Sequence, residues 1–508
     1  MLPVSLFVEL LRTKPRTVFW AAALAQAALW VIVPTLFYAA PPSQAALVLA
    51  VGHEFQLGSD FGPPLAFWLA EIFFAVAGMF GVYLLSQICV VTTYWAVFTL
   101  GSAIVGERHA AMAVLLMVGV SVFSVPTPDF GPGILAAALW ALSLLCYWRA
   151  VGQGERLYWY VLGFCVGLLA LTSYAALTLV ALLVICTLLL ACGRAQLMTV
   201  EPWIAAVIPV IVIFPHLIWL DRAGGSSIAG AMAMRESLRA WGYLIGALAL
   251  GHLGLGLLVA LAWGITRRRN MPAPEIERPP IDRSARLFVY FFAIAPALAI
   301  ALQVLITGHA DVLSGAPLVV LSGLAVIAAA PDRIRIVHQH LTAMAWVALL
   351  VLPPLLVGAA VMLLPWTVGI DLRVNYPAAE MGRFFADNFQ RRTGRPLAIV
   401  AGDSRTAALV ALTAPSRPSL YFGATPERSP WVTRSALDEK GAVVIWPTTD
   451  TSGTPPAAIR ERFPELVAEV PHAFERRFQG FLPLLRIGWG VIRPRGQGLV
   501  PPGDLQRQ

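Results

Sequence analysis

Apolar runs long enough to cross a lipid bilayer recur through roughly the first 365 residues of this 508-residue chain. A transmembrane helix needs about 20 predominantly apolar residues, and these runs meet that length. Hydrophobic residues make up 58% of the chain and charged residues only 13%, whereas a soluble domain carries roughly twice that share of charge. The sequence therefore predicts a mostly α-helical, polytopic membrane protein with about eleven or more spans.

The expected spans follow one another with short polar connections. We expect them near 17–39, 75–104, 109–125, 133–149, 157–172, 174–192, 203–220, 240–265, 286–307, 313–330 and 341–365. Together they define a multi-span membrane domain over residues 1–370. Glu71 lies in an otherwise apolar stretch of this domain, and a carboxylate at that depth is expected to face a polar partner or a cavity.

The charges between the apolar runs alternate in sign and so indicate an orientation. Basic residues precede the first span and recur in alternate loops, which the positive-inside rule places in the cytoplasm: Arg12, Lys14, Arg16, Arg108, Arg149, Arg156, Arg194, Arg267, Arg268, Arg269, Arg333 and Arg335. The opposite loops carry acids, with Arg222 as an exception: Glu54, Asp60, Asp129, Asp221 and Asp311. The net charge of +8 thus points to a lipid bilayer as a partner rather than to nucleic acid.

Residues 371–508 have an aqueous composition and predict a small α/β domain outside the cytoplasm. The stretch YPAAEMGRFFADNFQRRTG predicts a helix closed by Gly394, and SRTAALVAL predicts a second helix. PLAIVAG and AVVIW predict short buried strands. The GDSR turn at 402–405 lacks the glycines of a phosphate-binding loop, so we expect an ordinary helix N-cap there.

Several segments resemble, in the same order, those of glycosyltransferase family 39. LGSDFGPPLAFWL (57–69) resembles the first outer loop of that family, and VPTPDFGPGILAAALWAL (125–142) resembles its Thr-Pro-Asp segment. GLLALTSYAALTLVALL (167–183) and PWIAAVIPVIVIFPHLIWL (202–220) are similar to two later spans. RTGRPLAIVAGD and RPSLYF resemble the outer domain of bacterial members. The resemblance covers most of the chain.

Relatives of this kind include protein O-mannosyltransferases and lipid A aminoarabinose transferases, which are membrane-integral glycosyltransferases of the C type. The resemblance implies transfer of a hexosyl or pentosyl group, with inversion, from a polyprenyl-phosphate donor to an extracytoplasmic glycolipid, polysaccharide or protein. Such a transfer needs a base near the acceptor hydroxyl. It also needs positive charge near the leaving phosphate, from a divalent cation or from Arg and Lys side chains.

The catalytic candidates are carboxylates in the outer loops. Relatives commonly carry an Asp-Glu pair, or at least one acid, upstream of the two prolines, where this chain has Gln44 and Ala45. Asp60 is our first choice as a substitute base or metal-positioning acid in this loop, and Glu54 is the second; both can instead be solvated loop charges. Asp129 matches the Thr-Pro-Asp segment and is expected to have a functional part, a helix N-cap near Gly131, or both.

The substrate-binding candidates are the residues that match the remaining motifs. Pro63 and Pro64 begin a segment that returns to the bilayer, and the loop before them is expected to line a cavity. Ser173 and Tyr174 stand where many relatives have Lys-Tyr, and Ser173 can only hydrogen-bond a phosphate. The phosphate's counter-charge would then come from Arg222 or Arg235, which can equally be salt-paired loop residues. His216 is a further candidate, with a hydrogen-bonded helix-end role as the favoured alternative.

Two other functions stay open from the sequence. The missing acidic pair allows a catalytically degenerate member that binds lipid or a partner. A lipid or sugar transporter is less favoured, because the chain shows no duplicated halves. Arginine-rich, lysine-poor composition and the aqueous C-terminal segment suggest the inner membrane of a Gram-negative cell, with residues 371–508 in the periplasm.

Overall fold

The computed structural model describes residues 9–59, 61–125, 129–222, 234–263, 275–307, 317–421, 429–449 and 451–494. The chain divides into two compact units. Unit 1 comprises Met1–Pro34, Gly62–Ala66 and Phe80–Leu356, and unit 2 comprises Thr35–Phe61, Phe67–Met79 and Val357–Gln508. Unit 2 thus takes in the predicted C-terminal segment together with two stretches from the beginning of the chain. The predicted boundary at residue 370 stays a prediction.

The long helices are apolar along most of their length. They are α2 (Pro15–Phe37), α4 (Leu65–Val105), α5 (Glu107–Met117), α6 (Pro132–Tyr147), α7 (Leu157–Ala170), α8 (Ala175–Leu189), α10 (Glu201–Arg222), α11 (Met234–Gly251), α12 (Leu253–Trp263), α13 (Arg283–Thr307), α14 (Ser322–Ala329) and α15 (Gln339–Thr367). Shorter elements between them are a π-helical turn (Trp148–Gly152), α9 (Ala191–Gln196), and the paired strands β1 (Glu275–Glu277) and β2 (Arg333–Arg335).

Six of the described helices are long and apolar enough to cross a membrane, and the bent pair α11–α12 makes up to seven. Four further apolar helices among the described residues are shorter: Ser43–Gly52, Leu157–Ala170, Ala175–Leu189 and Pro317–Ala329. Each predicted span therefore overlaps an observed helix, but the number of eleven or more stays a prediction. The 41-residue helix α4 is interrupted at Ala77 and Gly78, where the backbone leaves helical geometry and Gly78 supplies a φ of 59°.

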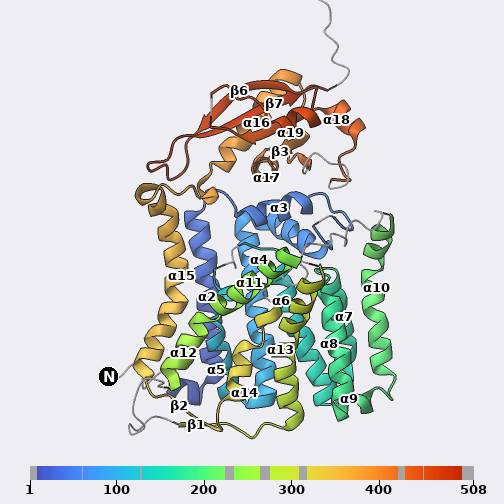
Figure 1. The fold of residues 1–508 in the computed structure, drawn as a ribbon, viewed down its shortest axis with the longest axis vertical. Helices are drawn as coiled ribbons and strands as arrows, with labels where there is room; N and C mark the ends of the chain where they lie inside the picture. The colour runs from blue at the N-terminus through green and yellow to red at the C-terminus, as the bar shows by residue number, and fades with distance from the viewer. Residues whose placement is uncertain are drawn as a thin grey trace, which may run out of the picture. The chain divides into compact units, whose positions relative to one another are not determined.

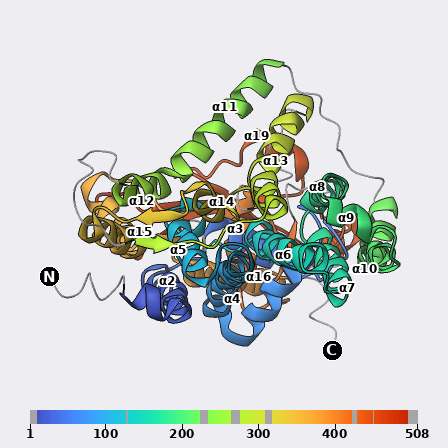
Figure 2. The same cartoon turned by 90° about the horizontal axis from the view of Figure 1, so that it is seen from below.

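Small residues let the helices of unit 1 approach closely. Helix α7 packs against α6, α8 and α10 (Figure 1, Figure 2). A Cβ atom on Gly163 would collide with the Ala205 carbonyl of α10, and one on Gly167 would touch Val212. Membrane helices gain stability mainly from such backbone approach, because burying apolar surface away from lipid yields little.

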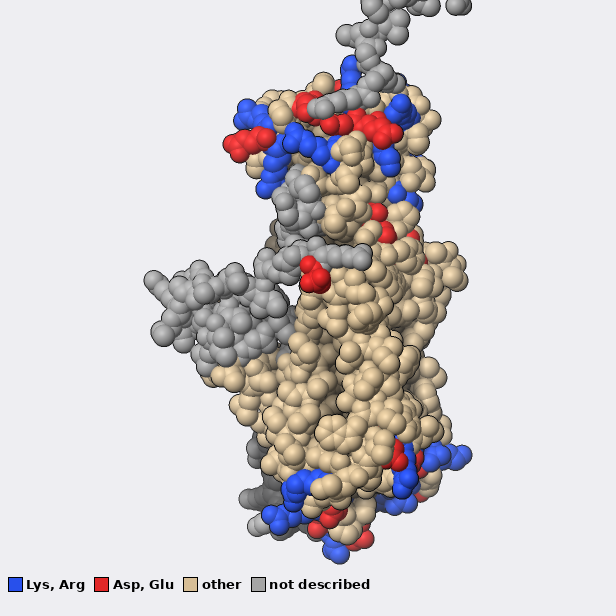
Figure 3. Space-filling view, turned by 90° about the vertical axis from the view of Figure 1, so that its right-hand side faces the viewer, with Lys and Arg blue, Asp and Glu red and all other residues tan. Residues whose placement is uncertain are grey.

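Charge in unit 1 is concentrated at one end of the helices. The face in Figure 3 shows uncharged side chains along the helices of unit 1, with Lys, Arg and a few acids gathered at their ends. Ion pairs join the loops at this end: Arg16–Glu107, Arg156–Glu201 at 3.4 Å, Arg278–Asp332 at 2.8 Å and Arg333–Glu277 at 3.2 Å. This distribution is typical of a membrane protein, whose charged loops lie outside the hydrocarbon.

Unit 2 contains a five-stranded mixed sheet in the order β4-β3-β5-β7-β6. Strand β3 is parallel to β4 and β5, and β7 is antiparallel to β5 and β6. The strands are β3 (Ile399–Gly402), β4 (Ser419–Tyr421), β5 (Ala442–Pro447), β6 (Val467–Phe474) and β7 (Leu485–Ile492). The helices are α3 (Ser43–Gly52), α16 (Ala378–Thr393), α17 (Ser404–Thr413), α18 (Arg434–Lys440) and α19 (Ala457–Arg462).

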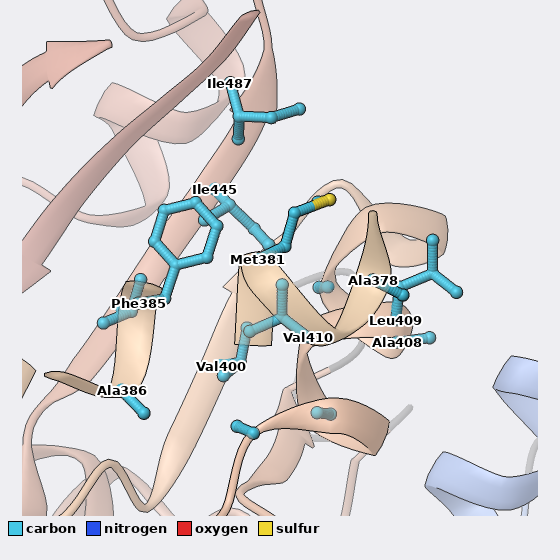
Figure 4. Close-up of a cluster of buried hydrophobic side chains, with 14 of the residues drawn as sticks. Ala378, Met381, Phe385, Ala386, Val400, Ala408, Leu409, Val410, Ile445 and Ile487 are labelled. Atoms are coloured by element: carbon cyan, nitrogen blue, oxygen red, sulfur yellow. The ribbon is translucent and has the colours of Figure 1, made fainter. Parts of the chain in front are cut away.

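Both faces of the central strand β5 are buried. Val443 and Ile445 of β5 contribute to a cluster that includes α16, α17 and α3, in which Phe385 and Val400 converge with Ile445 (Figure 4). The alternate β5 residues Ala442, Val444 and Trp446 contribute to a second cluster that includes α18 and α19. Side chains of a strand point to opposite faces in turn, so AVVIW is apolar throughout because both faces are covered.

The helix ends predicted from the sequence are observed in unit 2. Gly394 follows α16 in the left-handed conformation, with a φ of 68°, and its N–H donates to the Gln390 carbonyl at 2.8 Å. Asp403 caps α17 by accepting hydrogen bonds from the Thr406 N–H at 3.0 Å and the Thr406 hydroxyl at 2.6 Å. The GDSR turn is thus an N-cap, as expected.

Candidate functional site

In unit 2, the loop after α3 is held against the beginning of α4. A Cβ atom on Gly52 would collide with the Phe67 carbonyl and touch Glu71, so only glycine allows this approach. The Trp68 indole N–H donates to the Gln56 carbonyl at 3.0 Å and fixes the other end of the loop. The loop residues His53 and Glu54 are thereby placed beside polar residues of α4 and of the sheet.

Glu71 is a buried carboxylate with two partners. Both of its oxygens accept hydrogen bonds from Nη2 of Arg417, at 2.7 and 2.8 Å, and Oε1 lies 3.2 Å from Nδ1 of His53. The Arg417 guanidinium also lies 4.8 Å from the centre of the Phe74 ring. The expectation that Glu71 has a polar partner is confirmed. The Glu71 carboxylate beside Nδ1 orients the imidazole of His53. The other ring nitrogen, Nε2, does not contact Glu71.

Glu54 differs from Glu71 because none of the described residues forms a close ion pair with its carboxylate. Its Oε1 is buried without a hydrogen-bond partner among the described residues. Burial raises the pKa of the carboxyl group above its ordinary value, and the nearby Ser419, His53 and Lys440 side chains only partly oppose this rise. Glu54 is therefore half-buried rather than fully solvated, and its role stays a prediction. It has the raised proton affinity that a general base or acid requires.

The backbone around this cluster is strained. Among the described non-glycine residues, only Phe55 and Arg417 have a positive φ, of 46° and 48°. Phe55 follows Glu54 directly, and Arg417 is the partner of Glu71. Left-handed backbone in residues with a side chain costs free energy and often occurs at functional sites. Both strained residues of the described chain thus belong to one polar cluster.

A second group of candidates lies in unit 1. The Tyr174 hydroxyl lies 3.2 Å from Nε2 of His216, and the His216 ring stacks on Trp219 with centroids 5.7 Å apart. The Ser173 hydroxyl accepts from the Ala175 N–H at 3.2 Å, and the Leu65 N–H donates to the Leu171 carbonyl at 2.9 Å. His216 is thus a hydrogen-bonded residue within α10, whose last residue is Arg222, and its role stays a prediction. These bonds bring together the beginnings of α4 and α8 and the ends of α7 and α10.

The structure describes Asp129 but not Asp60. Asp60, our first choice in the first loop, lies outside the described residues. Asp129 is partly buried; α6 begins at Pro132, and its N-cap residue is Gly131. Asp129 is therefore not the N-cap residue itself but lies two residues before it. Its functional role stays a prediction.

The remaining candidates are placed only in part. Pro63 and Pro64 are buried directly before α4, which begins at Leu65, ahead of the span predicted near 75–104. Their part in substrate binding stays a prediction. Arg222 is the last residue of α10 and Arg235 lies in the first turn of α11. The side chains of both arginines lie outside the described part of the structure, and their pairing with a phosphate stays a prediction.

Sequence reasoning missed His53 and Arg417 as members of the unit 2 cluster. His53 directly precedes Glu54 in the sequence, and this adjacency to a candidate acid could have identified His53 as a further candidate. Arg417 is separated from Glu71 by 346 residues, and no local pattern connects the two. Only the fold of unit 2 brings them together.

A divalent cation would need several oxygen, nitrogen or sulfur ligands on this chain. Among the described residues, no three His, Cys, Asp or Glu side chains are grouped to hold one. The described part of unit 2 offers Glu54 and the His53–Glu71 pair instead.

Residues 62–219 match the family model of dolichyl-phosphate-mannose-protein mannosyltransferases. The predicted resemblance to C-type membrane glycosyltransferases is confirmed. The chain also shares the fold of ArnT from Cupriavidus metallidurans bound to undecaprenyl phosphate, with a TM-score of 0.55 and 14% identity over 94% of this chain and 97% of that one. The apo state of the same protein gives a TM-score of 0.57 and 15% identity over 94% and 98%. No curated protein matches the chain by sequence.

These findings establish a mostly helical, multi-pass membrane protein with an ArnT-like fold. The family match covers the segment from the two prolines to Trp219, which contains Asp129, Ser173, Tyr174 and His216. Glu54 precedes it. The roles of all these residues in catalysis or substrate binding stay predictions.

Proposed function

We propose that this protein is an integral membrane glycosyltransferase that moves a sugar from a polyprenyl-phosphate donor to an extracytoplasmic acceptor, with inversion at the anomeric carbon. The observation that carries the proposal is the agreement of two comparisons. Residues 62–219 match a mannosyltransferase family, and nearly the whole chain shares the fold of a protein solved with undecaprenyl phosphate. The transferred sugar is either a hexose or a pentose. The acceptor is a glycolipid, a polysaccharide or a protein.

In the proposed reaction, an acceptor hydroxyl attacks the anomeric carbon. Its proton passes to a carboxylate of the enzyme, the new glycosidic bond forms, and the bond from the sugar to the phosphate oxygen breaks. The polyprenyl phosphate leaves with the electron pair of that bond. Among the described first-loop acids, Glu54 suits the role of base because burial raises its pKa and one of its oxygens has no partner among the described residues. Asp60 and Asp129 are the other candidate carboxylates.

The leaving phosphate needs donors and positive charge. We assign this role to Tyr174 and His216 of unit 1, with Ser173 as a further hydroxyl and Arg222 or Arg235 as the counter-charge. The Tyr174–His216 hydrogen bond supports the assignment, because it holds two groups with O–H or N–H donors at one helix end. A divalent cation supplied with the substrate would serve the same purpose.

A second candidate function is lipid binding without turnover. It is favoured by the residues that replace the acidic pair of relatives. Gln44 is exposed on α3 and Ala45 is fully buried, so neither position offers a carboxylate. This function would keep the fold and the lipid site but leave the donor intact.

The test is release of polyprenyl phosphate by the purified protein from a polyprenyl-phosphate sugar, with and without a divalent cation. We expect release by the wild type, and Glu54→Gln to lower the rate at least about 100-fold, as for loss of a general base. Glu461→Gln, at an exposed position on α19, is the matched control and should keep the wild-type rate.

Three outcomes would contradict parts of this proposal. Lipid retention without release for any donor would indicate the binding function. Movement of substrate across vesicles with its sugar bond intact would indicate a transporter. If Asp60→Asn abolishes release and Glu54→Gln does not, the base is Asp60.

We further propose that the protein lies in the inner membrane of a Gram-negative cell, with residues 371–508 in the periplasm. The basic residues gathered at one end of unit 1 support this orientation through the positive-inside rule.

A further inference from the structure

A loop of unit 2 places large apolar side chains in exposed positions beside the end of α15. The side chains of Trp366, Val368, Ile370, Phe481 and Leu484 are all exposed, and Phe481, at 77%, is the most exposed of them. Phe481 and Leu484 belong to the loop between β6 and β7, whereas the other three belong to the last turn of α15 and the segment directly after it. We call these five residues the apolar tip.

The apolar tip is held together by contacts between the loop and the end of α15. The Phe481 ring meets the Trp366 ring edge to face, with centroids 5.9 Å apart. The Phe481 N–H donates to the Pro365 carbonyl at 3.0 Å, which is one of the carbonyls at a helix end that lack an intrahelical partner. Gly480 allows this approach, because its φ is 56° and a Cβ atom on it would collide with the Pro365 backbone. The exposed position of Phe481 is therefore fixed by the fold of unit 2.

Polar groups of this loop are bonded within unit 2. The Gln479 side chain accepts from the Arg476 N–H at 2.9 Å and donates to the Leu482 carbonyl at 2.6 Å. Arg476 donates through Nη1 to the Pro483 carbonyl at 2.6 Å and pairs with the Asp371 carboxylate at 2.8 and 3.0 Å. A loop in water can leave its carbonyls to the solvent, whereas irregular backbone beside lipid needs such internal partners. The loop thus exposes apolar side chains while these polar groups are satisfied.

The apolar tip continues the exposed side of a candidate membrane span. Helix α15 is one of the six described helices that are long and apolar enough to cross a membrane, and only 22% of its most apolar stretch is buried. Met362 and Leu363, which precede Trp366 on this helix, are exposed as well. A tryptophan at the end of a span is typical of the head-group level, where its ring meets both hydrocarbon and water. Exposed apolar surface therefore extends from α15 to Phe481.

We propose that the apolar tip inserts into the lipid bilayer, in the leaflet reached by the C-terminal end of α15, at the level of the head groups and the first part of the acyl chains. A contiguous exposed apolar patch marks an interaction site. Continuity with α15 selects lipid as the partner, and the internally bonded loop backbone permits contact with lipid. The insertion attaches the fold of unit 2 to the membrane surface, and it does not depend on the proposed glycosyl transfer.

Apolar contact, rather than charge, accounts for this attachment. Arg476 and Asp371, which lie beside the apolar tip, form an ion pair with each other. Burial of Phe481, Val368 and Trp366 in the interface removes apolar surface from water, and this gain is the same for any head group. We therefore expect insertion in a zwitterionic bilayer.

The experiment places a bimane fluorophore on Phe481→Cys in a Cys192→Ser background, with the full-length protein in phosphatidylcholine nanodiscs. Brominated acyl chains quench a fluorophore at bilayer depth, whereas iodide quenches one in water. We expect loss of emission with the brominated lipid and little loss with iodide. Val470→Cys is the matched control, because Val470 is 81% exposed but directly follows Glu469 of the Arg392–Glu469 ion pair. Iodide, and not the brominated lipid, should quench this control.

A second labelled position excludes a local effect of the substitution at Phe481. Ile370→Cys changes the other segment of the apolar tip and should also lose emission with the brominated lipid. Quenching of both positions by iodide alone would place the apolar tip in water and overturn the proposal. Protection of both positions from both quenchers would indicate that a protein surface covers the apolar tip, and this outcome would overturn the proposal as well.

Discussion

At the scale of single residues, the surroundings of Glu54 disfavour its charged form. Partial burial reduces the hydration of the carboxylate and raises its pKa, and the nearby hydroxyl and cations oppose this rise only in part. Glu71, by contrast, is stabilised by a direct ion pair with Arg417. Two acids of one cluster thus have different environments, an arrangement by which enzymes assign different roles to two carboxylates.

The raised pKa of Glu54 predicts opposite pH dependences for stability and activity. Because the pKa in the folded state lies above the ordinary value of 4.5, the contribution of protonated Glu54 to stability is complete below that value. It is lost as the pH rises through the folded-state pKa. Glu54→Gln, which stays neutral, should therefore have a higher thermal midpoint than the wild type at neutral pH and a similar one in acid. Donor cleavage should rise with pH in the wild type.

Thermal midpoints of wild type, Glu54→Gln and the surface control Glu461→Gln across this pH range check the prediction. A Glu54→Gln protein that is inactive and less stable at neutral pH would show that the residue is structural. A Glu54→Gln protein that is inactive but more stable would show that the wild type retains Glu54 for function at a cost in stability.

At the scale of secondary-structure elements, much of the fold follows from the sequence pattern. Long apolar runs predict the helices of unit 1, and the alternation of buried faces explains why β5 is apolar throughout. Gly394 and Asp403 mark helix ends by local chemistry alone. The polar cluster of unit 2 could not be predicted in this way, because Arg417 reaches Glu71 only through the arrangement of α4 beside the sheet. Asp129 lies two residues before the observed N-cap Gly131, and an error of that size in a helix boundary decides which residue occupies the N-cap position.

Gly402 and Gly394 provide a matched test of the sheet in unit 2. Both have a positive φ, of 113° and 68°. A Cβ atom on Gly402 would collide with the Ile445 backbone, whereas none of the described atoms lies within 4 Å of one on Gly394. Gly394→Ala should cost about 1 kcal/mol from backbone strain alone. Gly402→Ala should cost more than about 3 kcal/mol, because it also separates β3 from β5.

Thermal midpoints and protease resistance of the C-terminal segment measure the difference between these variants. Equal losses of stability would contradict the parallel pairing of β3 with β5. Gly394→Asn should be milder than Gly394→Ala, since asparagine tolerates the left-handed region.

At the scale of the whole molecule, the chain combines an apolar helical unit with a unit that encloses a mixed sheet. The contact between the first-loop residues and the C-terminal fold within unit 2 makes the cluster of Glu54 depend on both ends of the chain. Truncation of the sheet would remove Arg417 and Ser419 from this cluster. The orientation of the chain therefore decides on which side of the membrane any chemistry at Glu54 takes place.

Labelling of single cysteines tests that orientation. In a Cys192→Ser background, whose other cysteines are buried, we would introduce Lys14→Cys in unit 1 or Arg460→Cys in unit 2, both at exposed positions. A maleimide that does not cross the inner membrane should label the Arg460→Cys protein in cells with a permeabilised outer membrane, and the Lys14→Cys protein only after lysis. The basic residues around Lys14 are the physical reason, because positively charged loops are retained in the cytoplasm. The reverse labelling pattern would place Glu54 and the sheet in the cytoplasm. The acceptors proposed above are absent there, so the glycosyltransferase assignment would then need a cytoplasmic acceptor.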